Sequence, residues 1–186
     1  MVSTFIRTAA FALASTAVLP LASTASALPQ FEDQTGKTFS LGSLGNTPIV
    51  LTFVSAHCVD TCPIINAQFE AMQQHVRQSR IPLRLVTLTL DPAHDSRQDM
   101  LRIARTFEAD ARYWVIGSAS VSTTKTLMHE FGVTSSRGKR DYDDIHTTFV
   151  YLLDKHGHLV KTMLASTNLS GDLFAELQRN WNKLDG

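Results

Sequence analysis

Residues 47–63 read TPIVLTFVSAHCVDTCP, and this stretch decides the fold. Its first half, residues 47–54, is an almost unbroken run of β-branched and apolar residues, which is typical of a strand covered on both faces. Its second half ends in Cys62 and Pro63, and proline favours the first turn of a helix. Apolar residues then recur at helical spacing as far as about Gln78. The stretch therefore predicts a buried parallel strand that leads through a cysteine-bearing loop into a helix.

The alternation of strands and helices continues along the chain. We expect an edge hairpin at 31–40, strands at 83–90, 113–117, 146–153 and 159–165, and helices at 96–109, 121–131 and 170–184. This order predicts an α/β fold of the thioredoxin-like kind: a mainly parallel central sheet with helices on both faces and an antiparallel hairpin at its end. Ser96 is the expected N-cap of its helix. The polar segment 134–144 is expected to be an exposed loop.

The N-terminus has the order of a secretory signal. Arg7 is the only charge before Leu28, an apolar run follows at 8–22, and residues 25–27 supply the small residues of a cleavage site. The run is short for a membrane span. We therefore expect residues 1–27 to be a signal peptide and 28–186 to be a single domain exported across the inner membrane to the periplasm. An uncleaved anchor is the alternative, and only then is contact with the membrane expected.

The composition indicates one ordinary globular domain. The 186 residues carry 17 basic and 17 acidic side chains, and 44% of them are apolar, so neither disorder nor a nucleic-acid partner is indicated. We expect a monomer. The chain has two cysteines, Cys58 and Cys62, and a disulfide across so short a loop would constrain the unfolded chain very little. A chemical role for the two thiols is therefore favoured over a structural one.

Cys58 and Cys62 are four residues apart, a spacing that places Cα atoms about 6 Å apart along one face of a helix. At that distance two thiols can form a disulfide or converge on a soft metal ion. The start of a helix also favours thiolate over thiol, so we expect a lowered cysteine pKa. The residues themselves leave a redox-active dithiol and a metal site as open alternatives.

A metal site needs a third ligand, and the chain has seven histidines. His94 lies between Asp91 and Asp95 in a loop after a strand, and His146 begins a late strand that can face the cysteine loop. Exposure explains four others, which lie on expected helices or at the hairpin turn 155–158: His75, His129, His156 and His158. From the residues alone, His146 is one candidate among others.

Three segments resemble the SCO/SenC family in their order and spacing: TFVSAHCVDTCP at 52–63, LDPAHDS at 90–96, and YDDIHTTFVYLLDKHG at 142–157. The resemblance implies a thioredoxin-like fold and a copper site made by Cys58, Cys62 and His146. It also implies a role in assembling the binuclear copper centre of cytochrome c oxidase. The implied cofactor is Cu(I) or Cu(II). The implied partners are the copper subunit of the oxidase as acceptor, and a copper donor or thiol reductant.

The chain departs from the family pattern at three points. Val59 stands where many members have proline, and Ile145 stands where an aspartate usually precedes the histidine. The expected cleavable signal replaces the common membrane anchor. Without the usual aspartate, Asp143 or Asp144 is left to orient the imidazole. A different acceptor would be compatible with these departures.

Two other functions compete with a metallochaperone, and whether the chain is an enzyme stays open. The first is a thiol-disulfide oxidoreductase that reduces cysteines of the oxidase or of another copper protein. A generic thioredoxin is disfavoured because no proline follows Pro92 to stand opposite the dithiol, and Leu51 and Ser55 break the peroxiredoxin pattern. The second is a structural zinc site with His57 or His94, which would need four ligands.

Overall fold

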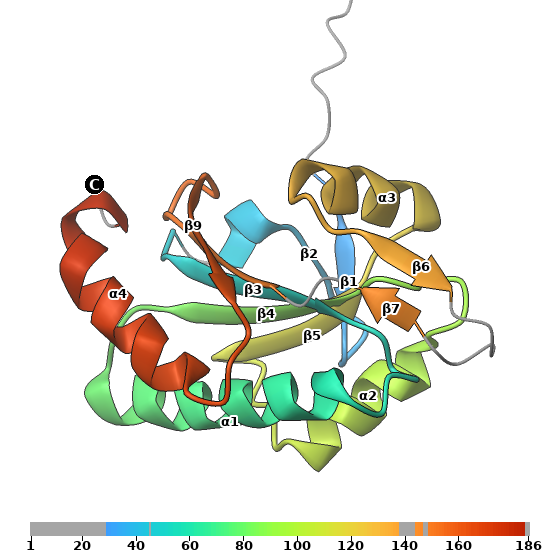
Figure 1. Cartoon of the computed structure of the whole chain (residues 1–186), viewed down its shortest axis with the longest axis horizontal. Coiled ribbons are helices and arrows are strands. Elements are labelled where there is room, and N and C mark those ends of the chain that lie inside the picture. Colours follow the sequence, from blue (N-terminus) through green and yellow to red (C-terminus); the bar gives the residue numbers. More distant parts are fainter. Residues whose placement is uncertain (1–28, 45, 138–143, 147–148, 185–186) are drawn as a thin grey trace, which may run out of the picture.

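The computed structural model describes residues 29–44, 46–137, 144–146 and 149–184; for 135–137 and 144–146 it describes the backbone alone. Its centre is a seven-stranded sheet in the order β2-β1-β5-β4-β3-β8-β9 (Figure 1). The expected α/β fold is confirmed. The strands of this sheet are β1 (Phe31–Asp33), β2 (Thr38–Phe39), β3 (Ile49–Val54), β4 (Arg84–Thr89), β5 (Trp114–Ser118), β8 (Phe149–Leu153) and β9 (Leu159–Leu164).

Strands β3, β4 and β5 are parallel and form the middle of the sheet, while β1, β8 and β9 add antiparallel strands on either side. Every residue of β3 is buried, as its continuous apolar run predicts. Because β3 and β4 are parallel, the loops that follow Val54 and Thr89 leave the sheet at the same end, where the carboxyl ends of both strands lie. The cysteines lie at that end.

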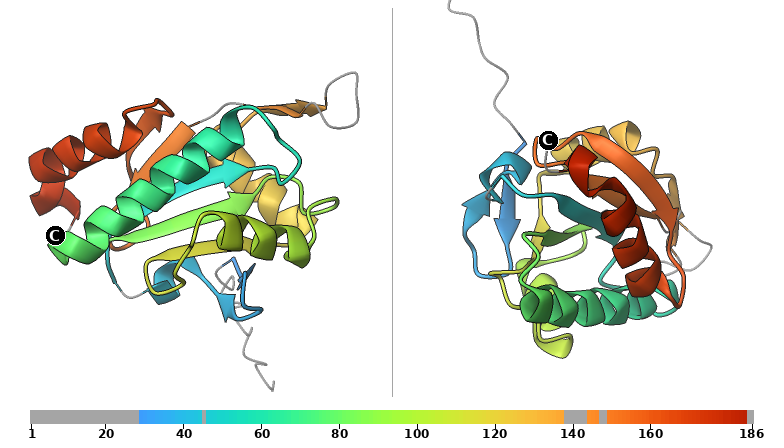
Figure 2. Two further views of the ribbon diagram at one scale, coloured as in Figure 1. Left: turned by 90° about the horizontal axis from the view of Figure 1, so that it is seen from below. Right: turned by 90° about the vertical axis from the view of Figure 1, so that its left-hand side faces the viewer.

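Helices cover both faces of the sheet (Figures 1 and 2). On one face, α1, α2 and α4 bury their apolar sides against a cluster that includes Phe69 and Trp114. On the other, α3 and the short 3-10 helix η1 pack on a second cluster that includes Phe53 and Tyr151. These elements are η1 (Leu41–Leu44), α1 (Thr61–Ser79), α2 (Arg97–Thr106), α3 (Val121–Glu130) and α4 (Leu169–Leu184).

Packing around Trp114 fixes α1 on the sheet. The Trp114 side chain is fully buried, its ring centroid lies 5.7 Å from that of Phe69, and its Nε1–H donates to Thr87 Oγ1 at 3.0 Å. Two large aromatic side chains removed from water contribute several kcal/mol together, at about 25 cal/mol per Å² of apolar surface. The helix that begins at the cysteines is therefore held firmly against β4 and β5.

The predicted N-cap of α2 is confirmed. Ser96 and Asp99 form a capping box, in which the Asp99 N–H donates to Ser96 Oγ at 3.2 Å and the Ser96 N–H donates to Asp99 Oδ2 at 2.8 Å. The edge hairpin at β1 and β2 is also confirmed, and Gly36 takes a φ of 86° in its turn, where a side chain would be strained.

The expected exposed loop at 134–144 is wrong in part, because residues 135–137 and 144–146 form two short strands. Strand β6 (Ser135–Arg137) pairs antiparallel with β7 (Asp144–His146), Ser135 lying opposite His146. His146 thus ends β7 instead of beginning a longer strand. Two three-residue strands without apolar alternation give little pattern to predict them from.

The expected signal peptide at 1–27 lies outside the described residues. Within the part of the chain that the structure describes, no helix has the length and apolar character needed to cross a membrane.

Candidate copper and dithiol site

The cysteine loop is a tight turn between β3 and α1. The Cys58 N–H donates to the carbonyl oxygen of Ser55 at 3.3 Å, and the His57 N–H donates to Ser55 Oγ at 3.3 Å. Cys62 is the second residue of α1, directly before Pro63 in the first helical turn. The chain therefore presents Cys58 from the loop and Cys62 from the start of the helix, as predicted.

The two cysteines are thiols in the structure and do not form a disulfide. Cys58 is partly exposed, whereas Cys62 is 2% exposed. The hydrogen bond that Cys62 makes to Cys58, followed by burial, raises the pKa of the Cys62 thiol well above its ordinary value. The expected lowering of the pKa at the helix start is therefore wrong for Cys62, because contact with the second sulfur and loss of solvent both favour the protonated thiol.

Asp95 lies beneath this loop and is the polar residue that ties it down. Its side chain is fully buried, and Oδ2 accepts hydrogen bonds from the Ala56 N–H at 3.1 Å and from Thr89 Oγ1. Burial is the main cause that raises the pKa of the Asp95 carboxyl. The sequence did not predict this role; the position of Asp95 in the LDPAHDS segment was the available signal.

His57 in the cysteine loop and His94 in the LDPAHDS segment both face carboxylates. His57 Nε2 lies 3.8 Å from Asp95 Oδ1, and His94 Nδ1 lies 2.9 Å from Asp91 Oδ1. Among the residues that the structure describes, no three His, Cys, Asp or Glu side chains form a group able to hold a metal ion. Within that part of the chain, neither His57 nor His94 completes a metal site with the thiols.

The backbone brings His146 to the end of the sheet where the cysteine loop lies. Strand β8 runs antiparallel to β3 with Val150 opposite Thr52, so the chain that precedes β8 lies toward the edge where β3 ends. In Figures 1 and 2 the β6–β7 pair lies at the same end of the sheet as the loop before α1. The side chain of His146 lies outside the described residues, and its role as a ligand stays a prediction.

A cavity of about 230 Å³ opens beside the thiols, between the start of α1 and one side of α2. Cys58 and Cys62 line it together with Asn66, Arg102 and Phe107. Sequence reasoning missed Asn66, although it follows Cys62 by one helical turn and so shares its face. An incoming group in this cavity would therefore lie beside both cysteines.

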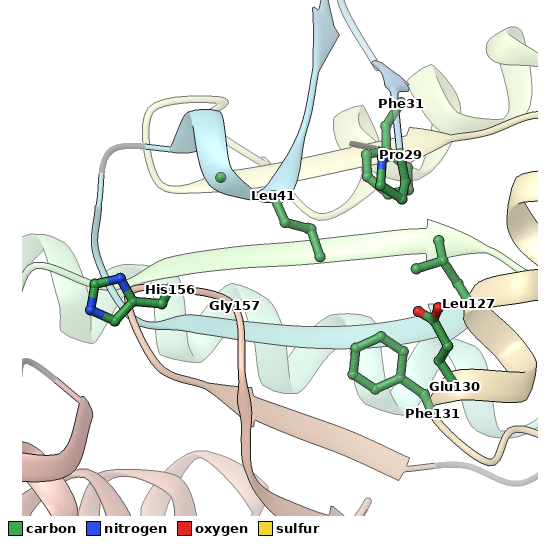
Figure 3. Close-up of a pocket in the computed structure, with 9 residues that line it drawn as sticks. Pro29, Phe31, Leu41, Leu127, Glu130, Phe131, His156 and Gly157 are labelled. Atoms are coloured by element: carbon green, nitrogen blue, oxygen red, sulfur yellow. The ribbon is translucent and has the colours of Figure 1, made fainter. Parts of the chain in front are cut away.

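A second cavity, of about 210 Å³, lies on the other face of the sheet, where α3 and η1 pack (Figure 3). Phe31, Leu41, Leu127 and Phe131 line it, and Glu130 and His156 are its ionisable residues. It contains neither cysteine, so the chemistry of the thiols belongs to the cavity beside α2.

Comparison with known proteins places the chain among relatives of this architecture. A "SCO1 protein homolog" of Bacillus subtilis is 22% identical over 133 residues, which is 70% of this chain and 69% of that protein. The structure of a SCO1/SenC family lipoprotein from Bacillus anthracis matches with a TM-score of 0.72 and 22% identity, over 81% of this chain and 90% of that one. The copper-bound structure of Bradyrhizobium japonicum ScoI matches with a TM-score of 0.69 and 21% identity, over 81% and 96%.

The family model described as SCO1/SenC matches residues 23–182, which include both cysteines, Asp95 and His146. This match spans nearly the whole chain and agrees with the fold. The chain belongs to the SCO1/SenC family.

Proposed function

We propose that this chain binds one copper ion through Cys58, Cys62 and His146 and delivers it during assembly of the binuclear copper centre of cytochrome c oxidase. The observation that carries the proposal is the hydrogen-bonded pair of thiols at the start of α1. A copper-bound structure of another Sco protein, from Bradyrhizobium japonicum, supports it.

The chemistry of the donor atoms fits copper as a cargo. Two thiolates favour Cu(I), and an added imidazole allows Cu(II) to be held as well. Cys62 must lose its proton to become a ligand, so binding releases protons and the ion supplies the charge that stabilises the buried thiolate. Three protein ligands leave a position for an incoming ligand, which suits transfer to an acceptor.

We infer that the protein works outside the cytoplasm. The support is the signal-like order of residues 1–27, which would leave 28–186 as one exported domain in the periplasm. Its acceptor there is the copper subunit of the oxidase, and a copper donor or a thiol reductant prepares the site. A monomer suffices for this role, because both thiols and His146 come from one chain.

The proposal is tested in cells that lack the protein. Cytochrome c oxidase activity should fall, recover when the wild-type chain is supplied, and stay low with Cys58→Ser or Cys62→Ser. His129→Ala, a substitution on α3 outside the thiol site, should restore activity as the wild type does. Normal oxidase copper content in the deletion strain would overturn the proposal.

The unequal burial of the two thiols favours a second candidate function, thiol-disulfide exchange. Cys58 is accessible to attack or to be attacked, while the buried Cys62 lies in hydrogen-bond contact, ready to close the disulfide. Turnover of insulin disulfides as fast as that of thioredoxin, by protein that retains no copper, would favour this function over the first.

A further inference from the structure

The cavity beside the thiols has the properties of a docking site. It measures about 230 Å³ and reaches from Ser55 and Ala56, under the loop, to one side of α2. Both cysteines are among the residues that line it, so a group that fills it lies beside them. Its occupant is therefore placed to react with them or to exchange ligands with them.

Asn66 supplies a hydrogen-bond acceptor that the rest of the described structure does not use. Its side chain is 3% exposed and lines the cavity, and its Oδ1 is buried without a hydrogen-bond partner among the described residues. Buried polar atoms nearly always have partners in native proteins. An unpartnered acceptor on a residue that lines a cavity is available to a ligand that brings an N–H or O–H donor.

The remaining walls define what else the ligand contains. Ile103 and Phe107 give an apolar surface, and Arg102 lies on the α2 side. Arg102 donates from Nη1 to Asp99 at 2.6 Å, and a guanidinium has five N–H donors, so it can also bind a carbonyl or carboxylate oxygen. An N–H donor, a carbonyl acceptor and a small apolar side chain are together the features of a peptide.

We propose that this cavity docks the peptide segment that flanks a reactive cysteine of the partner protein. A backbone N–H of that segment donates to Asn66 Oδ1, a carbonyl oxygen accepts from Arg102, and the adjacent side chain packs on Ile103 and Phe107. The partner's sulfur then lies against Cys58 and Cys62. The inference rests on the proposed role of the thiols and does not depend on copper.

The test compares two activated disulfides with the reduced, copper-free protein. One is a short cysteine peptide joined through sulfur to 2-thiopyridine, and the other is 2-hydroxyethyl 2-pyridyl disulfide, which has no peptide group. A protein thiolate attacks the probe's non-pyridyl sulfur and a new S–S bond forms. The old bond breaks, and pyridine-2-thiolate leaves with the electron pair and is protonated to the thione, which absorbance measures. Cys62 or Cys58 then closes the protein disulfide and releases the probe thiol.

Asn66→Leu keeps the side-chain size and removes the acceptor. We expect it to lower the rate constant for the peptide by about five- to tenfold, the effect of one lost hydrogen bond, and to leave the hydroxyethyl probe unchanged. Gln74→Leu, an exposed polar-to-leucine change on the same helix, should change neither rate constant. Equal rates for Asn66→Leu and wild type, or equal slowing with both probes, would overturn the proposal.

A second arm changes the peptide instead of the protein, so its main comparison is made with the wild-type protein and does not depend on how a variant folds. Peptides N-methylated at each residue flanking the cysteine lack one backbone donor at a time. One of them should react about five- to tenfold more slowly than the parent peptide, and Asn66→Leu should not slow it further. If every methylated peptide reacts like its parent, the docking site is excluded, whatever the protein does with copper.

Discussion

Asp95 holds the cysteine loop through Ala56: Oδ2 of the fully buried carboxyl accepts the Ala56 N–H at 3.1 Å. The same oxygen accepts from Thr89 Oγ1 at the end of β4. One carboxyl therefore joins the loop after β3 to the end of the neighbouring strand β4. Its contact in the loop, Ala56, lies two residues before Cys58.

Replacing Asp95 with leucine should destabilise the fold. The Ala56 N–H and the Thr89 hydroxyl would lose their acceptor in a buried place, which costs about 1–3 kcal/mol for each unsatisfied group. Asp95→Asn keeps an acceptor oxygen and should stay near the wild type. Urea unfolding at neutral pH measures both variants, and an equal loss for the two would show that hydrogen bonding to this oxygen is unimportant.

The capping box of α2 should make stability depend on pH. Hydrogen bonds from Ser96 and, more weakly, the charge of Arg102 lower the pKa of Asp99 from 3.8 to about 2. A depressed pKa stabilises the fold above pH 3.8, and this contribution is lost as the pH falls through about 2. Asp99→Asn should therefore cost about 0.5–1 kcal/mol at neutral pH, the usual size of the loss of one helix-capping interaction.

The measurement is the free energy of unfolding of wild type and Asp99→Asn across this range. The difference between them should shrink below pH 3.8 and nearly vanish once the pH is below about 2, where the Asp99 carboxyl is mostly protonated. A difference that is constant with pH would assign the effect of Asp99 to geometry instead of charge.

His146→Ala should weaken copper binding without unfolding the protein. The backbone places His146 at the end of the sheet where the cysteine loop lies. His57→Ala and His94→Ala are matched controls, because these side chains face Asp95 and Asp91. We expect copper affinity to fall at least tenfold for His146→Ala alone, which corresponds to about 1.4 kcal/mol. A larger loss with His57→Ala or His94→Ala would move the third ligand there.

The main elements could be predicted because local signals and burial agree. The residues of β3 are apolar at almost every position, and Pro63 marks the first turn of α1. Ser96 is a residue type that favours the N-cap, and it does cap α2. Strands β6 and β7 escaped prediction because their stability comes from pairing with each other, which sequence pattern does not show.

Of the site residues, only the two cysteines could be predicted from spacing and position. Spacing and position indicate Cys58 and Cys62, but the raised pKa of Cys62 follows from tertiary burial and from the second thiol. Asn66 and Asp95 have local signals, the helical spacing from Cys62 and the LDPAHDS segment, but their roles depend on how α2 and β4 pack around the loop. His146 was indicated by the family pattern, and copper binding must test it.

Anaerobic titration of the purified protein with copper, followed by visible absorption and metal analysis, tests the central claim most directly. The account predicts one copper ion per chain and, for Cu(II), a thiolate absorption band that Cys58→Ser and Cys62→Ser each abolish and His146→Ala weakens. Tight copper binding that survives both cysteine substitutions, or an unchanged band in His146→Ala, would contradict it.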